Sequence, residues 1–101
     1  MRQGTTPTHT FLLPFETSEI KVLELTYAQQ DTVILTKSLN DCVLNGKVVT
    51  IELSQEDTFL FDTTSQVQMQ LRVLTLTDQA YATEIYLGRV AKSLSKEVTN
   101  Y

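Results

Sequence analysis

An alternating stretch in the second half of the chain, QVQMQLRVLTLT from Gln66 to Thr77, constrains the fold more than any other feature. Apolar side chains occupy every second position, at Val67, Met69, Leu71 and Val73, with polar side chains between them. This two-residue period places the apolar residues on one face of a β-strand and the polar residues on the other. The stretch therefore predicts a central strand of an antiparallel sheet, with one face against the core and one face in water.

Segments with a similar pattern predict the strands around it. We expect strands at residues 8–15, 20–28, 32–38, 39–44, 47–53 and 81–90. Pro14 cannot donate a hydrogen bond to a neighbouring strand, so the first strand belongs at a sheet edge or ends there. Asn45-Gly46 joins two of the segments and predicts a two-residue type I′ hairpin, because both residues tolerate positive φ.

The last of these strands, from about Tyr81 to Val90, is expected to place alternate side chains on one face, namely Tyr81, Thr83, Ile85 and Leu87. Gly88 predicts a bulge or a bend in this strand. Before the central strand, Ser54-Gln55-Glu56-Asp57 has the spacing of a capping box, in which the serine oxygen accepts from free backbone N–H groups. It predicts one short helical turn; an ordinary polar loop is the alternative.

These elements, without a convincing long helix, predict an all-β fold: an antiparallel immunoglobulin-like β-sandwich of about seven strands with one short helical turn. A small β-barrel is the alternative. We divide the chain into an extended N-terminal arm (residues 1–7), the β-sandwich domain (8–90) and a C-terminal tail (91–101). The expected core faces include Leu23, Leu25, Val49, Ile51, Val67, Met69, Leu71, Val73, Ile85 and Leu87.

Charge and cysteine content exclude several classes of protein. The formal net charge is -4 and the 8 Lys and Arg residues are scattered singly, so we expect no nucleic-acid partner. The single cysteine, Cys42, cannot form an internal disulfide, which fits folding in a reducing cytoplasm. No apolar run approaches the roughly 18 residues of a membrane span, and the amino terminus lacks an apolar signal core. We therefore expect a soluble protein with no membrane partner and no Sec-type signal.

Residues that carry chemistry are few. Zinc sites and nucleophile–base pairs need several histidines and cysteines, and this chain has one of each, His9 and Cys42. We therefore expect no metal, no cofactor and no enzymatic activity. Acid–base candidates remain at Asp57 with Asp62 and at Glu52 with Glu56, but 12 acidic residues in a short chain produce such neighbours by chance.

Several short segments carry a resemblance that goes beyond fold class. They are Gly4–Phe11, Leu13–Phe15, Ile20–Lys21, Tyr27–Gln29, Leu53–Thr58 and Gln70–Thr75. In these segments the chain resembles a family of small β-sandwich proteins encoded by phages and prophages of Firmicutes, from Met1 to about Val90. The resemblance implies a structural or accessory protein of the virion, associated with the tail or baseplate, made in the host cytoplasm and carried in the virion. The expected fold also resembles the immunoglobulin-like amino-terminal domain of upper baseplate proteins in Gram-positive siphophages.

The resemblance and the residue pattern both favour an interaction module that acts through protein–protein contacts, with other virion subunits or with a second copy of itself. The polar arm and the strand near Pro14 predict β-strand addition, on the chain's own sheet edge or on a neighbour's. The predicted partner-binding residues are Thr5, Thr6, Thr8, Thr10, Phe11 and Leu13, with Phe11 and Leu13 in alternate pockets.

The alternative function is a glycan-binding or host-surface adhesion module. Three of the four tyrosines, Tyr27, Tyr81 and Tyr86, would form a sugar-stacking site if they converged on an exposed face. Packing within the core and across strands is the other role that these side chains can take.

Overall fold

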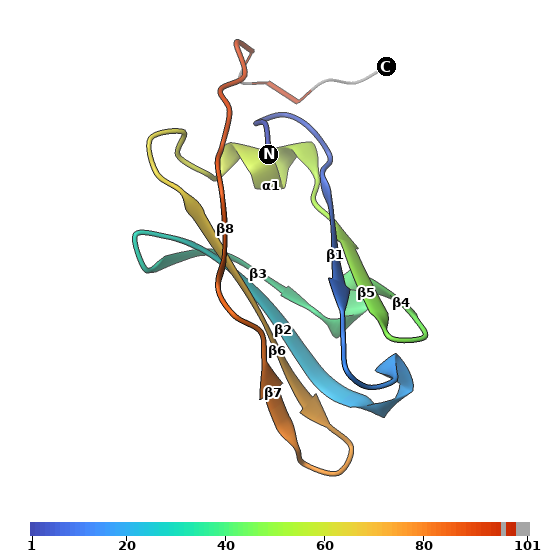
Figure 1. Ribbon diagram of the computed structural model, residues 1–101. Helices are drawn as coiled ribbons and strands as arrows, with labels where there is room; N and C mark the ends of the chain where they lie inside the picture. The colour runs from blue at the N-terminus through green and yellow to red at the C-terminus, as the bar shows by residue number, and fades with distance from the viewer. Residues whose placement is uncertain (96, 99–101) are drawn as a thin grey trace.

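The computed structural model describes residues 1–95, 97 and 98 and shows two antiparallel β-sheets packed against each other (Figure 1). The smaller sheet has the order β1-β5-β4, formed by Thr8–Leu12, Val48–Glu52 and Cys42–Asn45. The larger sheet has the order β3-β2-β6-β7, formed by Thr32–Ser38, Ile20–Gln29, Val67–Thr75 and Ala80–Ala82, and β8 (Tyr86–Gly88) also pairs with β6. Helix α1 (Gln55–Phe59) lies at one end of the sandwich, and 3-10 turns occur at Thr17–Glu19 and Leu39–Asp41.

The predicted all-β, immunoglobulin-like antiparallel β-sandwich is confirmed. The strands form two separate sheets and not the closed barrel that was the alternative. Within this architecture β2 lies between β3 and β6 in the larger sheet, whereas immunoglobulin domains place the second strand beside the first. The helical turn after Ser54 is also confirmed, because the Asp57 N–H donates to Ser54 Oγ and the Ser54 N–H donates to Asp57 Oδ2, both at 3.0 Å.

Strand β6 is central, as its alternating sequence predicts. It pairs with β2 along one side and with β7 and β8 along the other. Its inward residues Val67, Leu71 and Val73 are buried and Met69 is partly buried. The predicted core residues Leu23, Leu25, Val49 and Ile51 are buried as well.

The strand that follows β6 differs from the prediction. Two short strands replace a continuous strand at 81–90: Ala82 pairs with Arg72 and Tyr86 pairs with Met69, so residues 83–85 lie opposite only residues 70 and 71. This extra residue is a β-bulge, located before Gly88 and not at it. Thr83 holds the bulge, since its Oγ1 accepts from the Leu71 N–H at 3.0 Å.

The bulge reverses the side-chain alternation of the residues after it. Tyr86 packs on Phe11, with the two ring centroids 5.9 Å apart, while 44% of its surface stays exposed. Ile85 and Leu87 turn outward and are 55% and 61% exposed. The prediction that these two residues belong to the core is therefore wrong.

The type I′ conformation predicted for Asn45-Gly46 occurs instead in the hairpin between β2 and β3. Gln30 and Asp31 both have positive φ, 52° and 62°. The side chain of Gln68 holds this turn, because it accepts from the Asp31 N–H and donates to the Asp31 carboxylate, each at 2.9 Å. A tertiary contact thus supports a backbone conformation that these residue types rarely adopt.

The loop between β4 and β5 consists of residues 46 and 47, since Asn45 pairs with Val48. Only Gly46 has positive φ there, at 58°, which is the pattern of a type II′ turn. In this register Leu44 lies opposite Val49 and Cys42 lies opposite Ile51. Apolar side chains therefore meet across the hairpin, which favours this register over one with Leu44 opposite a lysine.

Candidate functional site

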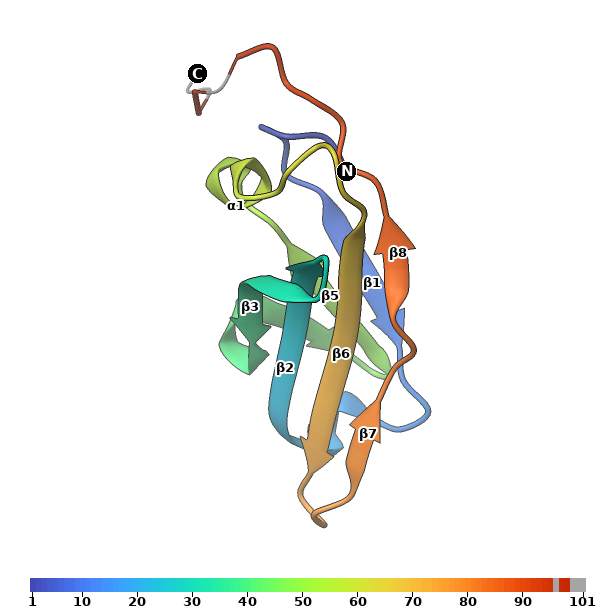
Figure 2. The ribbon, with the colours of Figure 1, turned by 90° about the vertical axis from the view of Figure 1, so that its left-hand side faces the viewer.

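The outward side of the larger sheet, here named the outer face, carries a group of exposed apolar side chains. Val22 of β2, Val33 of β3, Ile85 in the bulge and Leu87 of β8 are 52%, 60%, 55% and 61% exposed. Figure 2 shows the strands of this sheet side by side, with β2 between β3 and β6 and with β7 and β8 along the far edge of β6. Several exposed apolar side chains on one face of a sheet are typical of a contact surface.

The strand register arranges the outer face in rows that cross the sheet. From one end to the other, the rows are Val22–Leu74–Ala80, Ser38–Glu24–Arg72–Ala82, Thr36–Thr26–Gln70 and Val33–Ala28–Gln68–Leu87. The first row is apolar and the last is apolar except for one glutamine, whereas the middle rows carry a charge pair and polar side chains. The face therefore has apolar ends and a charged, polar centre.

Two hollows lie on the outer face and meet at its centre, since both are lined by Glu24 and Arg72. One, of about 390 Å³, extends toward Val22, Leu74 and Ala80. The other, of about 280 Å³, extends toward Val33 and Ile85 and is lined mainly by polar side chains. The first hollow could bury a protruding apolar side chain of a partner.

Glu24 and Arg72 lie directly opposite each other at the centre of this face. The ion pairs found among the described residues join Lys21 to Asp78 and Lys37 to Asp57, and involve neither of the two. Glu24 accepts only a long hydrogen bond, 3.3 Å, from Thr26 Oγ1. Both charges are thus available to groups on a partner.

The residues predicted to bind a partner do not form one surface. Thr5, Thr6, Thr8 and Thr10 are exposed, but Phe11 and Leu13 are buried in the core, with 7% and 2% of their surface exposed. The prediction that these two side chains occupy pockets of a partner is wrong. Because β1 pairs with β5, the alternation of side chains along this segment directs Phe11 and Leu13 into the space between the two sheets of the same chain.

The segment predicted as an extended arm is docked on the chain's own domain. Arg2 forms a parallel bridge with Ala91, in which the Gln3 N–H donates to the Ala91 carbonyl at 3.0 Å and the Ala91 N–H donates to the Met1 carbonyl at 2.8 Å. The Gln3 side chain is buried and donates to the Phe61 carbonyl at 2.9 Å. The bridge is isolated and lies outside the named strands, so among the described residues the segment is held by the chain itself but adds no strand to a sheet edge. Tail residues 96 and 99–101 lie outside the described residues.

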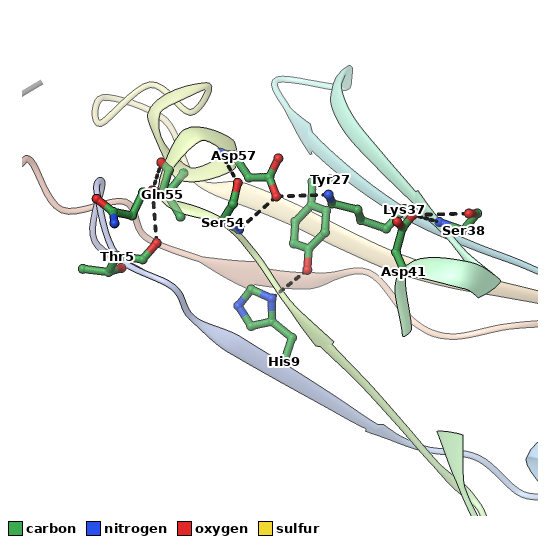
Figure 3. A network of polar contacts seen from close by, with 10 residues as sticks. Thr5, His9, Tyr27, Lys37, Ser38, Asp41, Ser54, Gln55 and Asp57 are labelled. Carbon is green, nitrogen blue, oxygen red and sulfur yellow. Dashed lines mark hydrogen bonds and ion pairs between the residues drawn. The ribbon is translucent and has the colours of Figure 1, made fainter. Parts of the chain in front are cut away.

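Polar contacts between the two sheets and around helix α1 form the network in Figure 3. Tyr27, fully buried in β2, shares a hydrogen bond of 2.7 Å with His9 Nδ1 on β1. Burial lowers the pKa of His9 and raises that of Tyr27, so both groups are neutral near pH 7. The pair satisfies two polar groups inside the sandwich, and its role is structural.

Lys37 of β3 forms an ion pair of 3.0 Å with Asp57 of helix α1. Burial alone raises the pKa of Asp57, but the Ser54 N–H and the Lys37 ammonium outweigh it and hold that pKa below 3.8. The carboxylate therefore stays ionised, caps its helix and ties the helix to the larger sheet. Asp62 was the residue paired with Asp57 as an acid–base candidate. Hydrogen bonds from the Thr64 N–H and hydroxyl to its carboxylate lower its pKa.

Asp57 and Asp62 do not have the pKa shift that a general acid requires. A general acid needs a raised carboxyl pKa, and Asp57 and Asp62 are shifted the other way. Burial raises the pKa of the Cys42 thiol, which disfavours the reactive thiolate. No group of three His, Cys, Asp or Glu side chains among these residues is placed to hold a metal ion. The described residues also contain no helix long and apolar enough to cross a membrane.

The three tyrosines do not converge on an exposed face. Tyr27 lies in the core against Phe61, at a centroid distance of 5.8 Å. Tyr81 makes an edge contact with Phe15 at 5.6 Å, and Tyr86 contacts a ring of β1. The packing role of these side chains is realised, and the aromatic platform that a sugar site would need is not formed.

Sequence reasoning did not anticipate the outer face as a contact surface. Val22 stands next to Leu23, and Val33 next to Ile34, at positions that the strand period assigns to the solvent side. The presence of these two apolar residues on an otherwise polar face was the sequence feature that could have indicated a contact surface. Ile85 and Leu87 gave no signal, because the bulge that turns them outward interrupts a regular alternation.

No protein-family model matches the chain, and no curated protein sequence matches it. Among solved structures, the V domain of amphioxus IgVJ-C2 is similar with a TM-score of 0.35 and 11% sequence identity, over 90% of this chain and 95% of that domain.

Proposed function

We propose that the protein is a non-enzymatic interaction module that acts through protein–protein contacts, and that the outer face is its contact surface. The observation that carries the proposal is the group of exposed apolar side chains on that face: Val22, Val33, Ile85 and Leu87. Exposed singly, such residues are unremarkable, but on one face of one sheet, at its two ends, they favour burial against a partner.

The partners, in this proposal, are proteins of a phage virion, with the tail or baseplate as the place of assembly. The support for this context is the resemblance of segments such as Gly4–Phe11 and Leu53–Thr58 to the phage and prophage family. A small sandwich that exposes apolar side chains gains stability when these are buried in a larger assembly, since its own core is limited.

Quantitative mass spectrometry of purified phage particles from the encoding host tests the proposal. The expected result is the protein at a fixed ratio to the known virion subunits. Its consistent absence from particles that are otherwise complete would overturn the virion role.

Two variants then test the surface. Ile85→Lys places a charge in an apolar end of the outer face, and we expect incorporation into particles to fall at least about tenfold. Val43→Lys is the matched control, since Val43 is 69% exposed but lies on the smaller sheet. Equal loss for both variants, or for neither, would contradict the assignment of the outer face.

A further inference from the structure

The outer face is complementary to itself. Each outward residue of β2 lies beside its register partner on β6: Val22 beside Leu74, Glu24 beside Arg72, Thr26 beside Gln70 and Ala28 beside Gln68. Consider a second copy related by a two-fold axis that runs parallel to these strands, between β2 and β6. The β2 strand of each copy then lies over the β6 strand of the other. Every outward residue of β2 therefore faces the copy of its own register partner.

Charge selects this axis over the alternative. About the axis parallel to the strands, Glu24 of each copy faces Arg72 of the other, so that two opposite-charge contacts form by symmetry. An in-plane axis perpendicular to the strands offers no such match. If it passes through the row of Glu24 and Arg72, like charges face each other, which is strongly unfavourable, and if it passes between rows, both charges face uncharged side chains. Only the axis parallel to the strands places each of these charges opposite a charge of the other sign.

The apolar rows agree with the same axis. Val22 of each copy faces Leu74 of the other at one end of the interface. At the other end, Ala28 pairs with Val33 and Gln68 pairs with Leu87, so Val33 of each copy faces Leu87 of the other. The exposed apolar residues of β3 and β8 are thus buried against each other.

We propose that the chain forms a symmetric homodimer in which the outer faces of two copies pack together, with β2 of each copy over β6 of the other. This inference rests on the proposed function and names its partner: the surface that binds protein binds a second copy. Two sheets packed with their strands nearly parallel follow the aligned geometry found inside β-sandwiches.

The dimension of the face sets the expected strength. The rows from residue 22 to residue 28 span about 20 Å along the strands, and four strands span about 14 Å across them. The resulting footprint of about 280 Å² on each copy is well below the roughly 800 Å² per partner of a standard specific interface. We therefore expect a reversible dimer whose population rises with concentration in the micromolar to millimolar range.

Sedimentation velocity on the full chain, from about 10 μM to about 1 mM in low salt, tests the dimer directly. Glu24→Arg and Arg72→Glu each place like charges opposite one another at both symmetry-related contacts. Each single variant should raise the dissociation constant at least about tenfold. The double variant Glu24→Arg/Arg72→Glu restores opposite charges and should return to within about threefold of the unaltered protein. Glu52→Arg, the same charge change on the smaller sheet, is the control and should not alter association.

Mixing the two single variants is the sharpest measurement. In a mixed dimer, one copy is positive and the other is negative at both positions, so both contacts are complementary although neither variant associates alone. We expect a 1:1 mixed dimer. All substituted residues are exposed, so each variant is expected to fold, and a thermal unfolding scan of each variant serves as the check.

Three results would overturn the inference: a wild-type chain that stays monomeric to 1 mM, single variants that dimerise like the wild type, or a mixture of single variants that remains monomeric. A monomer that is nevertheless present in purified particles would reject the homodimer and leave the proposed function standing. A charge-dependent dimer that is absent from particles would support the homodimer and reject the proposed virion role.

Discussion

Removal of the Tyr27 hydroxyl is expected to weaken the attachment of the two sheets to each other. Tyr27 is fully buried in the larger sheet, and its hydroxyl lies 2.7 Å from His9 Nδ1 in the smaller sheet. The substitution Tyr27→Phe deletes the hydroxyl and keeps the ring, which retains its edge contact with Phe61. The change in stability therefore reports on the hydrogen bond and on little else.

The magnitude follows from the environment of the two groups. A hydrogen bond between neutral groups contributes about 0.5–1.5 kcal/mol net, and a partner left unpaired in a buried place adds a cost of about 1–3 kcal/mol. His9 is only partly buried, so water can reach its ring and reduce that cost. We expect a loss of about 1–2 kcal/mol, which lowers the melting temperature by about 4–8 °C per kcal/mol in a domain of this size.

Urea and thermal unfolding at pH 7.5 measure this loss, with Tyr81→Phe as the control. Tyr81 packs against Phe15, and its hydroxyl makes no hydrogen bond among the described residues, so the control should change stability by less than about 0.5 kcal/mol. In a His9→Leu background, the effect of Tyr27→Phe should shrink by at least half. Equal effects of Tyr27→Phe and Tyr81→Phe, or no coupling to His9, would refute the reasoning.

Three further predictions concern stability. Burial lowers the pKa of His9, so the unfolded chain binds a proton at higher pH than the folded chain. Stability measured by urea unfolding should therefore fall as the pH drops below 6.5, by at most about 1.4 kcal/mol per pH unit, and His9→Gln should reduce this slope. Gln30→Asn should raise the melting temperature, with a gain of about 0.5–1 kcal/mol, because asparagine tolerates the φ of 52° better than glutamine; an unchanged or lower melting temperature would contradict this. Deletion of residues 1–7 should destabilise the domain by about 1–3 kcal/mol in urea, because it removes the Gln3 contacts to Phe61 and Ala91; a truncated chain as stable as the full one would show that the segment is not docked in solution.

The sequence predicted the elements that depend on local pattern. The alternation around Leu71 identifies the central strand, and the Ser54 capping box identifies helix α1, because both signals are complete within a short segment. The strands near Leu25 and Ile51 were found for the same reason. The residue pattern therefore predicted the positions of most strands and which face of each strand is buried.

Features that depend on distant contacts were missed. The bulge at 83–85 is held by a hydrogen bond between Thr83 and Leu71, and a regular alternation through Ile85 and Leu87 gives no indication of it. The positive φ of Gln30 and Asp31 is supported by Gln68 from another strand.

The candidate site was missed for a related reason. Its residues come from β2, β3, β6 and the bulged edge, and only the register of the sheet brings Val33 and Leu87 into the same row. The N-terminal residues were favoured instead because polar, extended sequence near Pro14 is typical of a free edge. Phe11 shows the limit of that argument, since strand pairing turns its side chain into the core.

Nuclear magnetic resonance spectra of the full chain, recorded at increasing concentration, test most directly the claim that the outer face is the protein-contact surface. The account predicts amide shifts that grow with concentration and concentrate on residues 22–28 of β2 and 68–74 of β6, with smaller changes near Val33 and Leu87. Shifts confined to the exposed threonines Thr5, Thr8 and Thr10, or spectra that do not change up to about 1 mM, would contradict it.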